Sequence, residues 1–224
     1  MGRAPLRAQQ GWRLVVLRAP AGALIGIFLA LAGCASVDSD EVVPIAQVRE
    51  EYKLGPVNPR AFTVCHEHGC QERSPVSLSP AQWGEVRALF TPLSANAAQE
   101  RARISQAIGL MERLVAPQAG TAGDVGGTFE GVGRGHGQLD CEDEAANTTQ
   151  YLAMMSDDGL IRFHSTVGWA WRGHFIHGWP HTATVIEEQG SGARWSVDSW
   201  FEDNGKPAHV VPVRQWKNGW APAH

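Results

Sequence analysis

Three residue types that together can perform acyl transfer lie in the second half of the chain: Cys141, His181 and Asp198. A cysteine nucleophile needs a nearby base that takes its proton and a third group that orients the base. We expect a helix to begin at Cys141, because Asp140 can cap it, and exposed amides at a helix start favour a thiolate. The residues therefore predict a catalytic site with His181 as base and Asp198 as orienting acid.

Two further features bear on this site. Glu142, Asp143 and Glu144 follow the cysteine directly and would disfavour a thiolate if they pointed at it. We therefore expect their carboxylates to turn toward solvent or cationic partners. The backbone amide of Cys141 is the expected donor to an oxyanion, with Gln138 as a helper.

The spacing between His181 and Asp198 matches a β-hairpin. Its turn is predicted to be Gln189-Gly190 or the four residues 189–192. A two-residue turn places the histidine opposite the aspartate, and a four-residue turn makes them diagonal neighbours on one face. Only an odd-length turn without a bulge would point one side chain away.

Helix signals dominate the first part of the chain and strand signals the last part. We expect helices over about 79–90, 96–115 and 140–155, with Pro117 ending the second of them. The charged residues of that second helix are predicted to form a solvated face: Glu100, Arg101, Arg103, Glu112 and Arg113. Candidate strands are 160–167, 171–177, 182–188, 194–200 and 209–213. Helices followed by strands predict an α+β domain with an antiparallel sheet.

Cys65 and Cys70 lie close enough in the sequence for a small disulfide loop, with Gly69 easing the turn. A zinc site is an alternative, since His66 and His68 lie between them, although four ligands in six residues would strain a tetrahedron. Free buried thiols are the remaining possibility. We favour the disulfide, which leaves Cys141 as the odd cysteine. The other histidines lack metal-ligand spacing, so neither a metal nor a cofactor is expected.

The N-terminus has the form of a signal peptide. Residues 1–33 contain four arginines and no acid, followed by an apolar run too short to span a bilayer comfortably. Leu31-Ala32-Gly33-Cys34 resembles the lipobox of bacterial lipoproteins, which implies cleavage before Cys34 and lipidation of its thiol. The resemblance implies a lipid-anchored protein of the bacterial cell envelope that faces the periplasm, with the outer membrane suggested by Ala35.

We expect three segments: a signal peptide over 1–33, the lipidated cysteine and a linker over 34–59, and one folded domain over 60–224. The linker is predicted because residues 35–59 show no sustained apolar periodicity. Loss of the four arginines would change the net charge of −4 to −8, which argues against a nucleic-acid partner.

Around the three candidate residues the chain resembles the transglutaminase-like superfamily, particularly its bacterial transglutaminase-like cysteine proteinases. Residues 137–145 match the cysteine segment, 179–183 the histidine segment and 195–200 the aspartate segment, in that order. The resemblance implies a papain/transglutaminase-like core, in which a cysteine-bearing helix packs on an antiparallel sheet and additional helices precede it. It covers roughly 137–200.

The function expected on this basis is a thiol peptidase or amidase that acts on a polypeptide or other amide through an acyl-enzyme thioester. Hydrolysis is favoured over cross-linking, because water is abundant in the periplasm and no amine-acceptor site is recognisable. The alternative is a noncatalytic envelope module that binds polypeptide, or serves as a scaffold, with the same cleft. A poised thiol would alkylate quickly near neutral pH, whereas a structural thiol would not.

Overall fold

A five-stranded antiparallel sheet organises the folded part of the chain. The computed structural model describes residues 41–128, 136–173 and 180–223. The strands of this sheet, in spatial order, are β1 (Val43–Pro44), β4 (His164–Arg172), β5 (His181–Glu188), β6 (Arg194–Asp198) and β7 (His209–Pro212). A separate hairpin contains β2 (Phe62–His66) and β3 (Glu72–Val76). The helices are α1 (Ile45–Glu51), α2 (Pro80–Leu89), α3 (Ala97–Ala119), α4 (Cys141–Asp157) and α5 (Val213–Lys217). Mixed helices and an antiparallel sheet confirm the α+β class.

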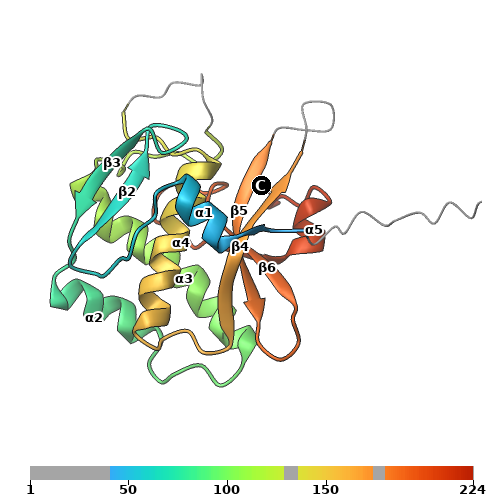
Figure 1. Cartoon of the computed structure of the whole chain (residues 1–224). Coiled ribbons are helices and arrows are strands. Elements are labelled where there is room, and N and C mark those ends of the chain that lie inside the picture. The colour runs from blue at the N-terminus through green and yellow to red at the C-terminus, as the bar shows by residue number, and fades with distance from the viewer. Residues whose placement is uncertain (1–40, 129–135, 174–179, 224) are drawn as a thin grey trace, which may run out of the picture. The chain divides into compact units, whose positions relative to one another are not determined.

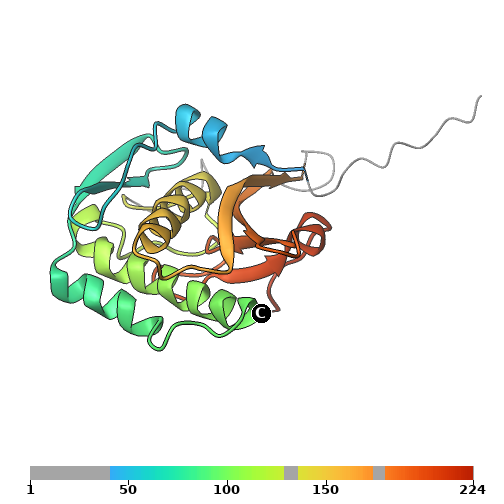
Figure 2. The same cartoon turned by 60° about the horizontal axis from the view of Figure 1, so that its bottom comes forward.

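Helix α4 lies in the middle of this unit, between the β2–β3 hairpin and the five-stranded sheet, with α3 running beside it (Figures 1 and 2). Polar contacts fix its position on the sheet. Thr184 of β5 donates its hydroxyl to the carbonyl of Ala145 at 2.8 Å, and Trp169 of β4 donates its indole N–H to Thr149 at 2.9 Å. A cysteine-bearing helix on an antiparallel sheet is therefore present.

Helices α2 and α3 begin where the sequence indicated. Ser79 and Gln82 form a reciprocal capping box at α2, and the side chain of Asn96 caps α3. The predicted end of α3 at Pro117 is wrong, because the helix continues to Ala119. Pro117 lies in the last turn, where it removes one intrahelical hydrogen bond without stopping the helix, and Gly120 in a left-handed conformation (φ 78°) ends it.

The predicted solvated face of α3 is wrong for its two glutamates. Glu100 is fully buried and accepts hydrogen bonds from the backbone amides of Arg162 and Phe163 and from Nδ1 of His164, at 2.8–2.9 Å. These partners are more than sixty residues away in the sequence, so helical periodicity alone could not reveal them.

Glu112 is also buried, and it accepts a hydrogen bond from the amide of Gly205 at 2.8 Å. Gly109, one turn earlier on α3, permits this approach. A Cβ at that position would stand 2.4 Å from the carbonyl oxygen of Lys206, so any side chain would push the 205–206 loop away.

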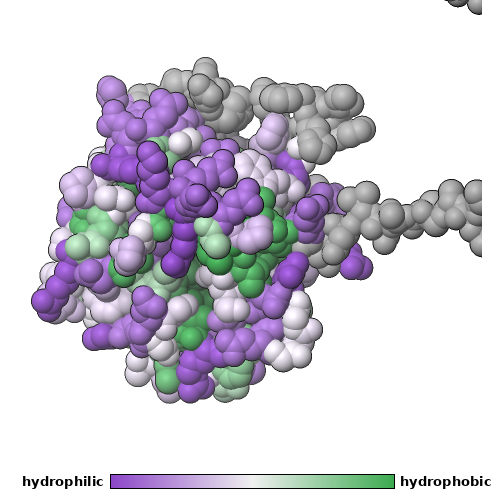
Figure 3. All heavy atoms as spheres, viewed as in Figure 1, coloured by the Kyte–Doolittle hydropathy of each residue, from purple (hydrophilic) through white to green (hydrophobic). Residues whose placement is uncertain are grey.

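Part of the segment expected to be a linker is folded. Val43 and Pro44 pair with Trp169 and Gly168 of β4. Val48 of α1 is buried in a cluster that includes both cysteines of the β2–β3 hairpin. The prediction of a linker up to residue 59 is therefore wrong from β1 onward, because a single helix of seven residues offers too little periodicity to detect. Figure 3 shows hydrophobic residues gathered beside α1, near the middle of the face that is turned to the viewer in Figure 1.

The signal peptide and Cys34 lie outside the described residues. Within the described ranges, no helix combines the length and apolar character that crossing a membrane requires.

The β2–β3 hairpin was not predicted, but the cysteine pair that closes it was. Cys65 and Cys70 are joined as a disulfide, with their Cα atoms 4.6 Å apart. The residues between β2 and β3 include four consecutive positive-φ residues, at positions 67–70, which form a tight loop. This outcome favours the disulfide over the zinc and free-thiol alternatives.

The two strands expected over 160–167 and 171–177 are one strand, β4, in the described part of that region. A bulge between Thr166 and Gly168 carries the strand through the point where a break was predicted. Gly168 adopts φ 151°, and a Cβ there would collide with the carbonyl of Val43. The glycine thus admits β1 to the sheet edge.

Candidate active site

Cys141 is the first residue of α4. The carboxylate of Asp140 accepts hydrogen bonds from the amides of Glu142 and Asp143 at 3.0 and 2.9 Å, and the Asp143 side chain accepts from the Asp140 amide. This reciprocal cap fixes the helix start where the sequence predicted it. The cysteine is a free thiol and is partly buried.

His181 and Asp198 meet across the β5–β6 hairpin. The amide of Glu188 donates to the carbonyl of Ala193 at 2.8 Å, so the turn has four residues and the two site residues are diagonal neighbours. His181 Nε2 lies 2.7 Å from Asp198 Oδ2, and both side chains are buried. The longer of the two predicted turns is confirmed, and with it the histidine–aspartate contact.

The other ring nitrogen of the histidine is free. His181 Nδ1 is buried and has no hydrogen-bond partner among the described residues, and the Cys141 sulfur is therefore not bonded to it. The thiol instead lies against the backbone N–H of Thr182, the residue that follows the histidine. The structure thus joins two of the three predicted residues and brings the cysteine to the start of the same strand.

Burial controls the ionisation of the thiol. It raises the pKa of Cys141 to about 12, and the negative charge of Asp140 adds to this effect. The N–H of Thr182 works in the opposite direction but is outweighed. The expectation that the helix start lowers this pKa is wrong for the resting structure, because desolvation of the thiolate exceeds the benefit of the helix amides.

The acids on either side of Cys141 are held by protein donors rather than by cations. Asp143 accepts the amides of His68 and Cys70 at 2.8 and 2.6 Å, and Asp140 accepts the amide of Gly69 at 2.9 Å. The disulfide loop therefore supplies their partners. Burial nevertheless raises the pKa of Asp143 to about 8.

Glu144 and Glu142 also have protein partners. Glu144 accepts the hydroxyl proton of Ser199 at 2.6 Å, and burial raises its pKa well above the ordinary value. Glu142 is hydrogen-bonded to Tyr52, and burial likewise raises its pKa. The prediction for these carboxylates is corrected: backbone amides and hydroxyls hold them.

Gln138 is engaged away from the thiol. Its Nε2 donates to the carbonyl of Gly123 at 2.9 Å, and its Oε1 accepts from the amide of Val125 at 3.3 Å. These contacts hold the 123–125 loop. A role of Gln138 as an oxyanion donor stays a prediction.

Trp216 is a site residue that the sequence did not reveal. Its indole N–H donates to Asp198 Oδ2 at 2.6 Å, so this oxygen accepts from both Trp216 and His181. The tryptophan is fully buried on α5, and its ring centroid lies 5.2 Å from that of the histidine. Nothing in the short, unpatterned sequence of α5 distinguishes this residue from an ordinary core tryptophan.

Aromatic rings and one cation complete the surroundings of the histidine. The ring centroids of Trp200 and Phe201 lie 4.5 and 5.2 Å from that of His181. Arg172 of β4 is the direct cross-strand partner of His181. Trp200 thus lies beside the site.

No group of three or more metal-binding side chains could hold a metal ion in the described ranges. Comparisons with family models, curated proteins and solved structures returned no match for the chain.

Proposed function

We propose that the protein is a thiol peptidase or amidase that forms an acyl-enzyme thioester on Cys141. One observation carries the proposal: the dyad of His181 and Asp198 leaves a buried, unpartnered Nδ1 at the strand against which the Cys141 thiol lies. A base with one nitrogen held by a carboxylate and the other nitrogen free has the arrangement that proton transfer from a nucleophile requires.

The proposed reaction has two stages. Cys141 Sγ attacks the amide carbonyl while its proton moves to His181 Nδ1, and the oxyanion is stabilised by the Cys141 backbone N–H. The C–N bond then breaks, and the departing amine takes the proton from the histidine. Water attacks the thioester with the same base, which releases the acid and restores the thiol. Hydrolysis is proposed ahead of transfer to a second amine.

The high pKa of Cys141 decides which form of the cysteine starts the reaction. With a value of about 12, the resting residue is a neutral thiol at pH 7. His181 must therefore remove the proton as the sulfur attacks, as a general base does for serine. A small rearrangement that brings sulfur to Nδ1 is part of the proposal, because these atoms are not hydrogen-bonded at rest.

We also propose that α4 and the β5–β6 hairpin are a papain/transglutaminase-like core, within the transglutaminase-like superfamily. The chain order of cysteine, histidine and aspartate supports this, as does the packing of α4 on β5 through Thr184. The early α1, the disulfide hairpin and α2–α3 are additions to that core.

The lipoprotein assignment remains a proposal based on residues 1–34. Lipid on Cys34 would anchor the enzyme in the bacterial cell envelope, facing the periplasm, with a polypeptide or other amide as substrate and no nucleic-acid partner. Loss of fatty-acid labelling in a Cys34→Ala variant is the expected result, and normal labelling of that variant would refute the anchor.

A noncatalytic binding or scaffold module is the second candidate. The state of Cys141 favours this candidate. The thiol is partly buried, its pKa is high and no base is hydrogen-bonded to it, which are properties that a purely structural cysteine would also have.

The rate of iodoacetamide labelling of Cys141 against pH separates the two functions, with each variant first shown to be folded and the labelled peptide identified by mass spectrometry. Cys141→Ala should abolish the signal. His181→Ala should slow labelling near pH 7 on the order of a hundredfold, and Asp198→Asn should slow it by a smaller factor. His136→Ala is the matched control, since that exposed histidine lies 3.7 Å from Glu67 and belongs to neither strand of the dyad. If wild type and His181→Ala share one profile with an apparent pKa near the ordinary thiol value of about 8.5, the enzyme proposal fails and the binding module stands.

A further inference from the structure

Arg172 lies beside the proposed site, and its guanidinium forms no ion pair in the described part of the chain. It is the last residue of β4 and pairs directly with His181 of β5, so the two side chains leave the sheet on the same face. A half-buried arginine is ordinarily paired with a carboxylate. Here no described carboxylate lies within ion-pair distance, and Asp198 acts on the guanidinium only through its charge at longer range.

Hydrogen bonds fix the orientation of the guanidinium. Nη1 donates both of its protons to backbone carbonyls, those of Trp216 and Trp220. The group also stacks over two rings, with Cζ 4.4 Å from the centroid of Trp216 and 5.6 Å from that of Phe201. The arginine is therefore held in one pose before any ligand arrives.

The bonds that fix Arg172 leave one edge of the guanidinium open. Nε and Nη2 have no partner among the described residues, and neither is among the polar atoms sealed from solvent. These two nitrogens form the side-on edge that accepts the two oxygens of a carboxylate in parallel. Trp216 and Phe201, which flank the guanidinium, also flank the His181 ring, with centroids 5.2 Å away in each case. The open edge and the free Nδ1 thus belong to one aromatic-walled region.

We propose that the Nε–Nη2 edge of Arg172 binds a carboxylate of the substrate, so that the amide attacked by Cys141 lies close to a negatively charged carboxylate group. The inference rests on the proposed function and names its substrate class: an acyl compound or peptide whose free C-terminus or acidic side chain is near the scissile amide. The arginine acts here in binding and specificity, and takes no proton.

A pair of alkylating reagents tests the subsite without knowledge of the natural substrate. Iodoacetate and iodoacetamide transfer nearly the same group to a thiol, but only iodoacetate carries a carboxylate. The quantity to measure is the ratio of their labelling rates at Cys141 at constant pH and ionic strength. A positive charge on His181 would also attract iodoacetate, so the wild-type ratio alone does not show that Arg172 binds the carboxylate. The test is how far the ratio changes when Arg172 is substituted.

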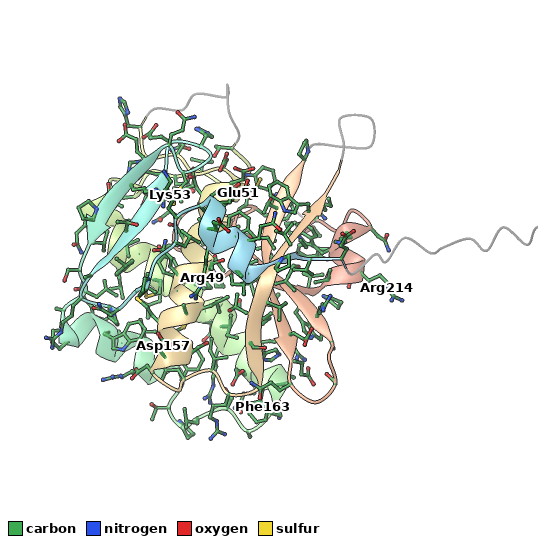
Figure 4. All side chains as sticks on the ribbon, in the orientation of Figure 1. Arg49, Glu51, Lys53, Asp157, Phe163 and Arg214 are labelled. Atoms are coloured by element: carbon green, nitrogen blue, oxygen red, sulfur yellow. A yellow bond between two sulfur atoms is a disulfide. The ribbon has the colours of Figure 1, made fainter. Side chains whose placement is uncertain are left out.

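Arg172→Met should lower the iodoacetate-to-iodoacetamide ratio by about tenfold, the loss expected for a charge-assisted bidentate contact. Arg172→Lys, which keeps the charge but not the fork, should lower it by a smaller factor. Arg214→Met is the matched control: this arginine is on α5 and points outward in Figure 4, so its loss changes the net charge equally and should leave the ratio nearly unchanged. If Arg172→Met slows both reagents by the same factor, the residue only ties Trp216 and Trp220 to the sheet, and the subsite proposal is wrong.

Protection experiments identify the source of the carboxylate. Acetyl-Ala-Ala with a free C-terminus and acetyl-Asp amide should each be tested for slowing of iodoacetamide labelling, against acetyl-Ala-Ala amide as the neutral control. Protection by the first assigns a C-terminal carboxylate, and protection by the second assigns an acidic side chain. Equal protection by the neutral peptide, or none by either acid, overturns the proposal. These ratios are read separately from the His181→Ala profile, so the subsite can fail while the proposed nucleophile stands.

Discussion

Two buried histidine–carboxylate pairs lie on neighbouring strands of the large sheet, and they differ in one respect. His164 at the start of β4 lies 2.9 Å from Glu100, and His181 at the start of β5 lies 2.7 Å from Asp198. In the first pair every nitrogen is used, because Arg101 lies 3.1 Å from His164 Nε2. A guanidinium only donates, so Nε2 must accept and the proton is on Nδ1. In the second pair Nδ1 has no hydrogen-bond partner within the ranges that the structure describes.

The comparison teaches that a buried histidine–carboxylate contact is not in itself a site. Glu100 accepts two backbone amides in addition to its histidine, so its pair closes a network that holds α3 to the chain before β4. Asp198 instead fixes one side of His181 and leaves the other side open. The open nitrogen, and not the ion pair, is what distinguishes the catalytic candidate from the structural pair.

The carboxyl pKa values are also shifted in opposite directions in the two regions. Around His164, burial raises the pKa of Glu100, but hydrogen bonds from His164 and two amides outweigh it, so the pKa is lowered overall. Around Glu144 of α4, burial dominates: it raises the pKa of Glu112 to about 8 and that of Asp124 to about 7. One region is built around a carboxylate and the other around carboxylic acids.

The largest expected effect is on the structural pair. Glu100→Ala should lower the free energy of unfolding by roughly 3–5 kcal/mol, because it leaves a buried histidine and two amides without an acceptor. Asp198→Asn should destabilise much less, since the amide oxygen can still accept one of the two donors. Urea unfolding followed by tryptophan fluorescence measures both. Equal losses for the two variants would remove the distinction between the pairs.

The next effect is the dependence of stability on pH. Glu112 has a folded pKa of about 8 against an ordinary 4.5, so the folded state binds the extra proton and the stability it brings is lost as pH rises from about 4.5 to 8. The loss should be on the order of 1 kcal/mol per pH unit while this group titrates. Glu112→Gln, which keeps the acceptor for Gly205, should reduce the slope of the unfolding free energy across that range, while Asp124 and Asp143 still contribute to it. An unchanged slope in the variant would show that Glu112 is ionised in the folded protein.

Glu100 provides the opposite sign as a control. Its lowered pKa means that its contribution is complete above about 4.5 and is lost as pH falls further. Glu112→Gln should therefore leave the acid limb of the stability curve as it is in the wild type.

The smallest effect concerns the second donor to Asp198. Trp216→Phe keeps the ring that stacks on His181 but removes the N–H, so it should slow iodoacetamide labelling of Cys141 by a factor of about three to ten. We expect the labelling profile to move along the pH axis as well, which a purely structural change would not cause. Trp169→Phe, which loses an indole bond to Thr149 within the core, is the control. A common loss in both variants would assign Trp216 to packing alone.

Local signals were sufficient for the parts of the site that depend on near neighbours. Asp140 caps the helix that begins at Cys141, and the four-residue turn after Glu188 sets the diagonal contact of His181 with Asp198. Capping and hairpin register involve residues a few positions apart, so their physics is readable in the sequence.

The remainder depends on distant partners. The partners of Glu100, and the disulfide-loop amides that bind Asp143, are more than sixty residues away in the sequence. The high thiol pKa results from burial that only the folded chain creates. Trp216 reaches Asp198 from a short helix that has no pattern of its own. For such features periodicity gives no signal, and polar residues of α3 and α4 were consequently assigned to solvent.

The contact of α3 with the 205–206 loop has a consequence for tracing the ancestry of this chain. A glycine at 109 and an acid one turn later at 112 are required together, since one admits the loop and the other binds its amide. Reactive residues can recur by convergence on unrelated scaffolds, because the same reaction selects them. The pairing of Gly109 with Glu112 serves only the packing of this fold, so no reaction selects it. Homologues that have lost Cys141 should therefore still retain Gly109 and Glu112, and descent would be better traced through these two positions than through the nucleophile.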